Sequence, residues 1–352
     1  MKKFIYLIAI MGILIIINGC DNMEYNLKTL DMKQVKIGVV ETTAGDYDSR
    51  IHWYDEDLNK VSQKNMKYAM LGSAFHNPVY YGDEIYMIPQ GLGSKKDSKK
   101  VIGLNKNDFK ITEFPFKNIA LNDVAVSGNY IYTINTLNGS THICRLDKNQ
   151  NTLEEVILNN EYVSGITAVK EKIYAFSANM LSPSPEFYIY IYNEDLELLD
   201  KNDITQYGTG QYKFMYDDEN YLYTGVMMTK EDRPASTILK ISVDTNEIEA
   251  IDISEEFPND ILQYKDKIII TNHDLVGYEG TKITVLDKTT QEFESVDLNI
   301  KTEFSDIMDN FLVVLNQEKI SLYNIENKFE LIKEISIEKK DNSYISGIII
   351  IE

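Results

Sequence analysis

The chain has 352 residues, with 35 Lys and Arg against 55 Asp and Glu, and a formal net charge of −20. A surface this acidic repels nucleic acid phosphates, which argues against nucleic-acid binding. Only two cysteines occur, Cys20 and Cys144, so a CxxC redox or zinc motif is absent. Cys144, flanked by Ile143 and Leu146, is expected to pack inside a strand.

The first twenty residues have the layout of an export signal. Lys2 and Lys3 precede an unbroken apolar run at residues 4–17, and INGC ends the segment at residue 20. Fourteen apolar residues rise about 21 Å as a helix, short of the ~30 Å hydrocarbon core of a membrane. The ending resembles the lipobox of bacterial lipoproteins, in which the cysteine is lipidated. The alternative is an ordinary cleaved secretory signal with an incidental cysteine.

The lipobox resemblance implies a signal peptide at 1–19, lipidation (palmitate and related chains) of Cys20, and a tether at 20–34. The protein would then be anchored at the outer face of a bacterial cytoplasmic membrane. Removal of 1–19 leaves 33 basic and 55 acidic residues, a charge of −22. This charge also repels anionic headgroups, so the acyl chains must anchor the protein without a polybasic segment. A monomer is expected.

Alternating residues indicate strands through the rest of the chain. In FYIYIY, residues 187–192, the tyrosines face one side and Phe and Ile face the other, which suits a strand and not a helix. Six similar strands follow a short polar turn, and their anchor residues lie 46, 42, 49, 46 and 44 positions apart. The anchors are Ile85, Ile131, Ile173, Leu222, Ile268 and Leu312. A repeat of this length indicates stacked or radial units.

A second repeated element is an Asp- or Asn-rich hairpin turn. It occurs in seven segments, which begin at Tyr54, Leu104, Leu146, Tyr192, Val243, Leu286 and Tyr323. The unit that contains the first hairpin begins with VKIGVVE, residues 35–41, and has no inner strand ahead of it in the sequence. The chain ends in YISGIIIIE, which repeats YVSGITAV of residues 162–169 and supplies that strand.

These counts predict an all-β domain at 35–352, a seven-bladed β-propeller whose first blade is completed by the C-terminal strand. Residues 35–352 number 318, about 45 for each blade. Closing the ring this way removes a free sheet edge and buries the isoleucines.

Two segments carry a family resemblance. KIIITNHDLVGYEGTKITVLDKTTQEFESVDL, residues 267–298, resembles a repeat of the YVTN class in the quinoprotein-like propeller superfamily, and IYTIN at 131–135 is the next best match. The resemblance implies fold and not function, because propellers host binding, scaffolding and several enzyme chemistries. No GxSxG motif occurs, and the lone Trp53 and Cys144 argue against a quinone-dependent dehydrogenase.

Candidate site residues lie on the rim formed by the loops between blades and between second and third strands, which we call the loop rim. Polar groups at the inner-strand entries would converge at the channel mouth, where Asp, Asn and His can bind a calcium-type ion or a ligand. The alternative is that they cap strands and hold channel water. These residues are His76, Asn77, Asn122, Asp123, Asn259, Asp260, Ser305 and Asp306.

Longer loops on the same rim offer apolar and aromatic groups for contact with a partner, or simply packed side chains. The candidate contact residues in these loops are Tyr47, Met180, Met227, Met228, His273 and Tyr278. For His273 the acidic surroundings would favour the charged form. The opposite rim, built from the hairpins and called here the hairpin rim, is expected to be inert.

Two function classes remain open on the sequence. The first is a non-catalytic binding module for a protein, peptide or glycan, with no cofactor. The second is a metal-assisted, lactonase-like hydrolase with its site at the channel mouth. No recognisable catalytic set is present, which favours the first.

Overall fold

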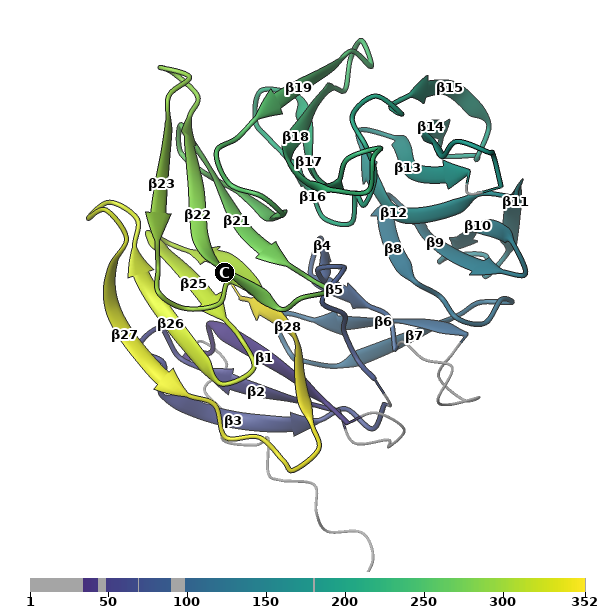
Figure 1. Ribbon diagram of the computed structural model, residues 1–352. Coiled ribbons are helices and arrows are strands. Elements are labelled where there is room, and N and C mark those ends of the chain that lie inside the picture. Colours follow the sequence, from purple (N-terminus) through teal and green to yellow (C-terminus); the bar gives the residue numbers. More distant parts are fainter. Residues whose placement is uncertain (1–33, 44–48, 69, 90–98, 180, 352) are drawn as a thin grey trace, which may run out of the picture. The chain divides into compact units, whose positions relative to one another are not determined.

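The computed structural model describes residues 34–43, 49–68, 70–89, 99–179 and 181–351. No α-helix occurs within these ranges, and their strands form seven four-stranded antiparallel sheets around a central axis (Figure 1). The prediction of an all-β, seven-bladed propeller is confirmed. The proposed signal peptide and tether, 1–33, and Tyr47 and Met180 lie outside the described residues.

Blades are numbered in chain order, with strands given from the inner to the outer edge. Blade 1 contains β28 (Tyr344–Ile350), β1 (Ile37–Thr42), β2 (Arg50–Tyr54) and β3 (Lys60–Asn65). Blade 2 contains β4 (Val79–Tyr81), β5 (Glu84–Met87), β6 (Lys100–Asn105) and β7 (Ile111–Pro115). Blade 3 contains β8 (Asp123–Ser127), β9 (Tyr130–Leu137), β10 (Ser140–Asp147) and β11 (Leu153–Asn159). Blade 4 contains β12 (Tyr162–Val169), β13 (Lys172–Asn179), β14 (Glu186–Asn193) and β15 (Leu198–Asp203).

The remaining three blades follow the same order. Blade 5 contains β16 (Phe214–Tyr216), β17 (Tyr221–Met228), β18 (Pro234–Ser242) and β19 (Ile248–Asp252). Blade 6 contains β20 (Pro258–Tyr264), β21 (Lys267–Asp274), β22 (Glu279–Asp287) and β23 (Phe293–Asp297). Blade 7 contains β24 (Phe304–Met308), β25 (Phe311–Leu315), β26 (Lys319–Asn324) and β27 (Glu330–Ser336).

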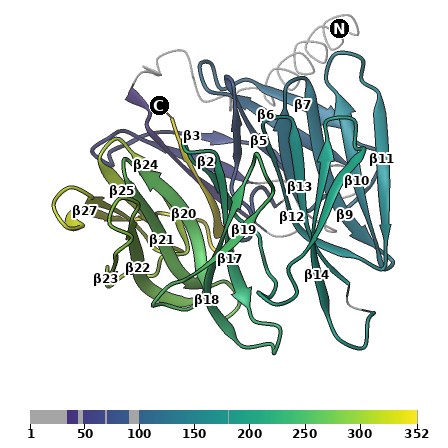
Figure 2. The same ribbon diagram turned by 90° about the horizontal axis from the view of Figure 1, so that it is seen from above.

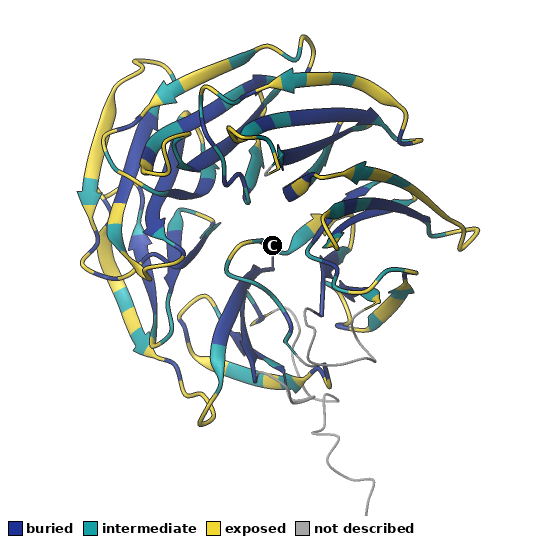
Figure 3. Cartoon of the chain, turned by 45° about the vertical axis from the view of Figure 1, so that its right-hand side comes forward, coloured by how far each residue is buried: buried dark blue, intermediate teal, exposed yellow. Residues whose placement is uncertain are grey.

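Burial differs between the strands of a blade. The second and third strands carry most of the buried residues, whereas outer strands such as β11 and β27 alternate between exposed and half-buried residues (Figure 3). In the turned view β9, β10 and β11 lie side by side, as their pairing requires (Figure 2). The core therefore lies between neighbouring blades, where sheet faces pack on each other.

The C-terminal strand closes the ring. β28 pairs with β1, with Ile350 opposite Ile37 and Ile348 opposite Val39. The side chains of Ile345, Ile348 and Ile350 are at most 5% exposed and pack in one hydrophobic cluster with residues of blades 1 and 7. The terminal isoleucine run is therefore a buried inner strand, as predicted.

The repeated SGI phrase has a structural role. Ser164 Oγ in β12 donates a hydrogen bond to Gln211 O at 2.8 Å, and Ser346 Oγ in β28 donates to Leu71 O. Gln211 and Leu71 each lie in the segment that leads to the next blade. Both serines therefore join an inner strand to the entry of the following blade.

The seven predicted hairpins are all present as the third and fourth strands of the blades. Several begin with a local side-chain bond: Asp147 Oδ1 accepts from Asn149 N at 2.7 Å, and Asp287 Oδ1 from Thr289 N at 2.9 Å. In the hairpin between β6 and β7 of blade 2 the residue with positive φ is Phe109 (54°), not Asn or Gly. Its ring stacks on Trp53 at 4.5 Å, so packing between blades offsets the strained backbone.

Candidate functional site

Asp260 is the centre of a buried polar layer at the inner-strand entries. Its Oδ1 accepts a hydrogen bond from Asn77 Nδ2 of blade 2 at 3.0 Å and lies 2.8 Å from Lys213 Nζ at the entry to blade 5. Its Oδ2 accepts from the backbone N–H and the hydroxyl of Ser305 in blade 7, at 2.8 and 2.9 Å. Four blades therefore meet on one carboxylate, and the charge of Lys213, which is 2% exposed, is neutralised there.

Asp123 of blade 3 forms a second such contact. Its Oδ2 accepts from Ile166 N of blade 4 at 2.9 Å and lies 3.3 Å from His76 Nδ1. The same His76 nitrogen lies 3.3 Å from Tyr212 O. A proton on Nδ1 suits both acceptors, so the segment before β4 is held between blades 3 and 5.

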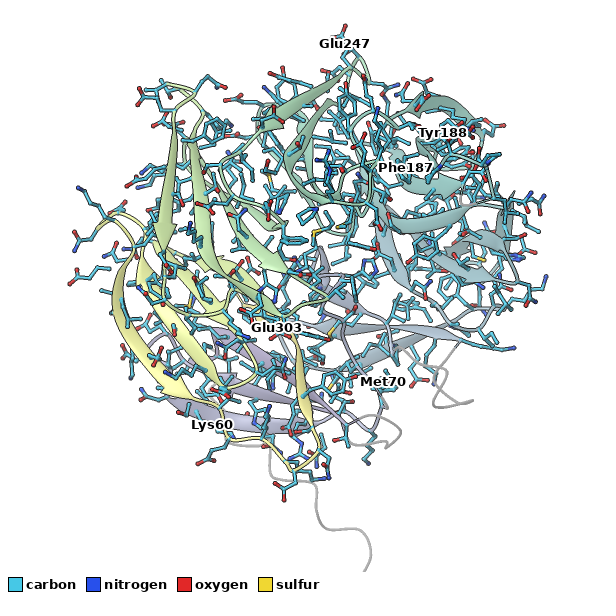
Figure 4. All side chains as sticks on the ribbon, in the orientation of Figure 1. Lys60, Met70, Phe187, Tyr188, Glu247 and Glu303 are labelled. Carbon is cyan, nitrogen blue, oxygen red and sulfur yellow. The ribbon has the colours of Figure 1, made fainter. Side chains whose placement is uncertain are left out.

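Glu303 lies beside this polar layer. Figure 4 shows it inside the ring near β28, in contrast to Glu247 at the outer edge of the molecule. It is 4% exposed, and burial raises its pKa despite a hydrogen bond of 2.6 Å from Gln317 Nε2 and the nearby Lys213 ammonium. Gln317 in turn joins blade 7 to the closing strand, because its Nε2 also donates to Ile345 O.

The eight expected channel-mouth residues do not form an open ion site. Asp260 and Asp123 already accept hydrogen bonds from protein donors, and Asn259 Nδ2 donates to the carbonyls of Thr302 and Glu303. Within the described ranges, no group of three or more His, Cys, Asp or Glu is arranged to hold a metal ion. This donor set does not fit a divalent cation, so the metal-assisted hydrolase gains no support from these residues.

The expected contact residues on the loop rim differ in exposure. Tyr278 is 54% exposed and Met228 is half-buried, whereas Met227 and His273 are buried, at 8% and 1% exposed. The expectation of an exposed, readily protonated His273 is wrong. Burial lowers the pKa of His273 to about 4, and the nearby Lys213 ammonium acts in the same direction.

A cavity of about 630 Å³ lies on the other side of the polar layer, toward the hairpin rim. On the inner strands it contacts the residues that lead into the turns between first and second strands, such as 261–265 of blade 6 and 305–309 of blade 7. These turns lie on the same rim as the hairpins. Asn77 and Ser305 line its inner end. The cavity therefore lies on the side of the hairpin rim, whereas the sequence placed the candidate site at the loop rim.

Two smaller cavities, of about 350 and 260 Å³, adjoin the first, and Tyr80 of β4 lines all three. Polar and apolar groups share the lining of the main cavity. Its aliphatic, Met and Phe residues come from four blades: Phe214, Met215, Ile261, Leu262, Ile307, Met308, Ile350 and Ile351. Four lysines and three acids also line the three cavities: Lys36, Lys106, Lys170, Lys265, Glu171, Asp306 and Asp309. Basic and acidic groups therefore lie beside apolar residues, and the space has an amphipathic lining.

Sequence reasoning missed Tyr80 as a site residue. It lies in an inner strand of only three residues, Val79–Tyr81, which is too short to show alternation. The only usable signal was the tyrosine pair that precedes the turn at Gly82 and Asp83.

Two smaller expectations can be compared with the structure. Cys144 is 3% exposed in β10, and burial raises the pKa of its thiol to about 11, as suits a packed strand residue. Among the described residues, no helix is long and apolar enough to cross a membrane.

No family model and no curated protein matches the chain. Solved structures do match it. A protein from Desulfotomaculum acetoxidans, described as functionally unknown, has a TM-score of 0.59 at 10% identity and covers 89% of this chain and 98% of its own. The dihydro-heme d1 dehydrogenase NirN, in complex with DHE, has a TM-score of 0.55 at 14% identity, covering 90% of this chain and 76% of its own.

Apo AztD from Citrobacter koseri is similar at a TM-score of 0.54 and 10% identity, covering 89% of this chain and 97% of its own. At such identities the likeness shows the fold alone. The expected fold-level resemblance to propeller proteins is thereby confirmed.

Proposed function

We propose that this chain is a binding protein, anchored through Cys20 at the outer face of a cytoplasmic membrane, that takes a small amphipathic molecule into its central cavity. The observation that carries the proposal is the cavity of about 630 Å³, which opens on the hairpin rim and is lined by both apolar and polar side chains. Ligand sites in proteins typically have volumes of about 300–1,000 Å³, apolar walls and a few polar groups.

The polar groups of the cavity supply the specificity that such a site needs. Tyr80, Asn77 and Ser305 line its walls and inner end, and charged residues line its mouth. The loop rim, by contrast, has its converging acids engaged by protein donors. These contacts favour a ligand in the cavity over a ligand on the loop rim.

The anchor is supported by the lipobox-like ending of the leader and by the position of the chain entry. Lys36, just before β1, lines the cavity, so the chain enters the propeller beside the open mouth. A tether of 15 residues, at 20–34, spans at most about 50 Å. Lipidation at Cys20 would therefore keep the propeller within about 50 Å of the membrane.

The test uses 8-anilinonaphthalene-1-sulfonate, an amphipathic fluorescent probe, titrated into the full-length chain in lipid nanodiscs, with empty nanodiscs subtracted. Ile307→Trp fills the cavity wall, and Val276→Trp, at a loop-rim residue that is 80% exposed, is the matched control. We expect wild type and control to bind alike and Ile307→Trp to bind at least about tenfold more weakly, since losing one ring's apolar contact removes at least ~1.4 kcal/mol. Equal binding by all three proteins, or none by wild type, would contradict the proposal.

A further inference from the structure

The wall of the central cavity is also the seam of the ring. Lys36, beside the N-terminal strand β1, and Ile350 and Ile351, at the end of β28, all line the cavity. Ile351 N donates a hydrogen bond to Lys36 O at 2.8 Å. The start of β1 and the end of β28, which close the propeller, therefore meet at the cavity wall.

Tyr80 connects that wall to the next blade. Its hydroxyl accepts a hydrogen bond from Ile350 N at 2.8 Å, and its ring, 39% exposed, lines the cavity. A single side chain from blade 2 thus lines the cavity and also bonds the backbone at the end of the closing strand.

The other end of β28 is fixed by separate contacts. Gln317 Oε1 accepts from Ile345 N at 2.9 Å, and buried Glu41 accepts from Lys340 N at 2.8 Å just ahead of the strand. These contacts lie away from the cavity-lining residues 350 and 351. The two ends of β28 are therefore held by separate sets of contacts.

We infer that ligand occupancy of the central cavity and docking of the C-terminal end of β28 are thermodynamically coupled, with Tyr80 as the positioning residue. The inference rests on the proposed function. When residues 348–351 detach, Ile350 and Ile351 leave the cavity wall, so a ligand that contacts this wall binds the closed ring more tightly. A ligand that prefers one of two forms shifts the equilibrium toward that form. Filling the cavity therefore holds the ring closed.

The test measures amide hydrogen exchange in the full-length chain in nanodiscs, with and without 8-anilinonaphthalene-1-sulfonate. At a probe concentration ten times its Kd, exchange at residues 348–351 is expected to slow by about tenfold. Strand β13 lines none of the three cavities and serves as the internal reference, with a much smaller change expected.

Two tyrosine variants separate the seam contact from the cavity wall. Tyr80→Phe keeps the ring but removes the hydroxyl that Ile350 N contacts, so exchange at 348–351 without probe should rise by about two- to tenfold. Tyr81→Phe is the matched control, because its hydroxyl accepts from Gly128 N at 2.8 Å, a bond of the same kind to blade 3. This control should leave exchange at 348–351 unchanged.

The outcomes separate the inference from the proposed function. If the probe binds but slows exchange equally in β13 and at 348–351, or if both tyrosine variants behave alike, the coupling is wrong and the binding proposal stands. If the probe does not bind the wild-type protein, the binding proposal fails, and the coupling fails with it.

Discussion

Asn77 of blade 2 and Asp260 of blade 6 are joined by a hydrogen bond of 3.0 Å between Nδ2 and Oδ1, although the residues are 183 positions apart. The bond runs between blades that are not neighbours in the ring. It shows that the segment ahead of β4 reaches into the channel and helps to close it on the side of the loop rim.

The first prediction concerns the ion pair in this layer. Asp260→Asn keeps the shape of the side chain but leaves Lys213, whose side chain is 2% exposed, without its carboxylate 2.8 Å away. Removing one partner of a buried ion pair typically costs about 3–5 kcal/mol. We expect a loss of that size in the free energy of unfolding, measured by urea denaturation.

The control for this change is Asp266→Asn, in the exposed turn of the same blade. It should alter stability by less than about 0.5 kcal/mol. Similar losses in both variants would show that the buried Lys213 pair contributes no more to stability than an exposed acidic residue does.

The second prediction concerns pH. Burial lowers the pKa of His273 to about 4. Because the unfolded chain takes up this proton near pH 6.5, the stability that neutral His273 contributes is complete above about pH 6.5. It is lost as pH falls toward 4, and the shift corresponds to about 3 kcal/mol over this window.

Melting temperatures at pH 7 and pH 4.5 test this linkage. His273→Leu should lose less stability on acidification than wild type, whereas His142→Asn, at a partly exposed histidine, should behave as wild type. Burial also lowers the pKa of His52, so part of the pH dependence should remain in the variant. An unchanged pH profile in His273→Leu would exclude His273 as its source.

The third prediction concerns ring closure. Deleting residues 344–352 removes β28 and exposes the edge of β1. It also removes the contacts of several buried isoleucines, each of which contributes about 1.5–3 kcal/mol. Against a total stability of about 5–15 kcal/mol, the truncated chain should misfold or aggregate. Size-exclusion chromatography of the soluble fraction is the measurement, and a soluble truncated protein with unchanged melting would refute the closure.

The fold was predictable because it depends on patterns that survive in one sequence. The spacing of strand anchors near 45 residues, the seven polar hairpins and the repeated YVSG and YISG phrases identified the blades and the closing strand. The site was not predictable to the same degree. Whether polar groups at the inner-strand entries stay open or bind one another depends on packing across the channel.

Lys213 illustrates why. Nothing in its local sequence shows that its ammonium lies against Asp260, because the partner is in another blade. Likewise, Tyr80 gains its place in the cavity from the short inner strand of blade 2 and from the end of β28. Contacts between residues this far apart in the chain leave no periodic signal.

The fourth prediction concerns the anchor, which lies outside the described residues. If Cys20 is the lipidated residue, Cys20→Ser should leave an unprocessed precursor or release protein into the medium. Labelled palmitate should no longer be incorporated. Membrane retention and processing that are unchanged in Cys20→Ser would remove the lipoprotein assignment, while Cys144→Ser serves as the control because that thiol is buried in β10.

The fifth prediction compares the two glycines of the repeated SGI phrase. A Cβ on Gly165 in β12 would lie 2.8 Å from Gln211 O and 2.7 Å from the ring of Phe214, whereas a Cβ on Gly347 in β28 would meet nothing closer than 3.7 Å. Overpacking of this kind costs about 1–3 kcal/mol, because backbone or ring must move. Where space is free, Gly→Ala instead stabilises by about 0.4–1 kcal/mol, because the unfolded chain loses freedom.

Gly165→Ala should therefore lower the free energy of unfolding and Gly347→Ala should leave it unchanged or raise it, both measured by urea denaturation. The two positions share the same local sequence, so any difference must come from what the next blade places against them. In blade 5 that neighbour is the Gln211–Phe214 segment, whereas a Cβ on Gly347 would have only Val40 of its own blade within 4 Å. Equal effects of the two substitutions would show that the inner strands of blades 1 and 4 are packed alike.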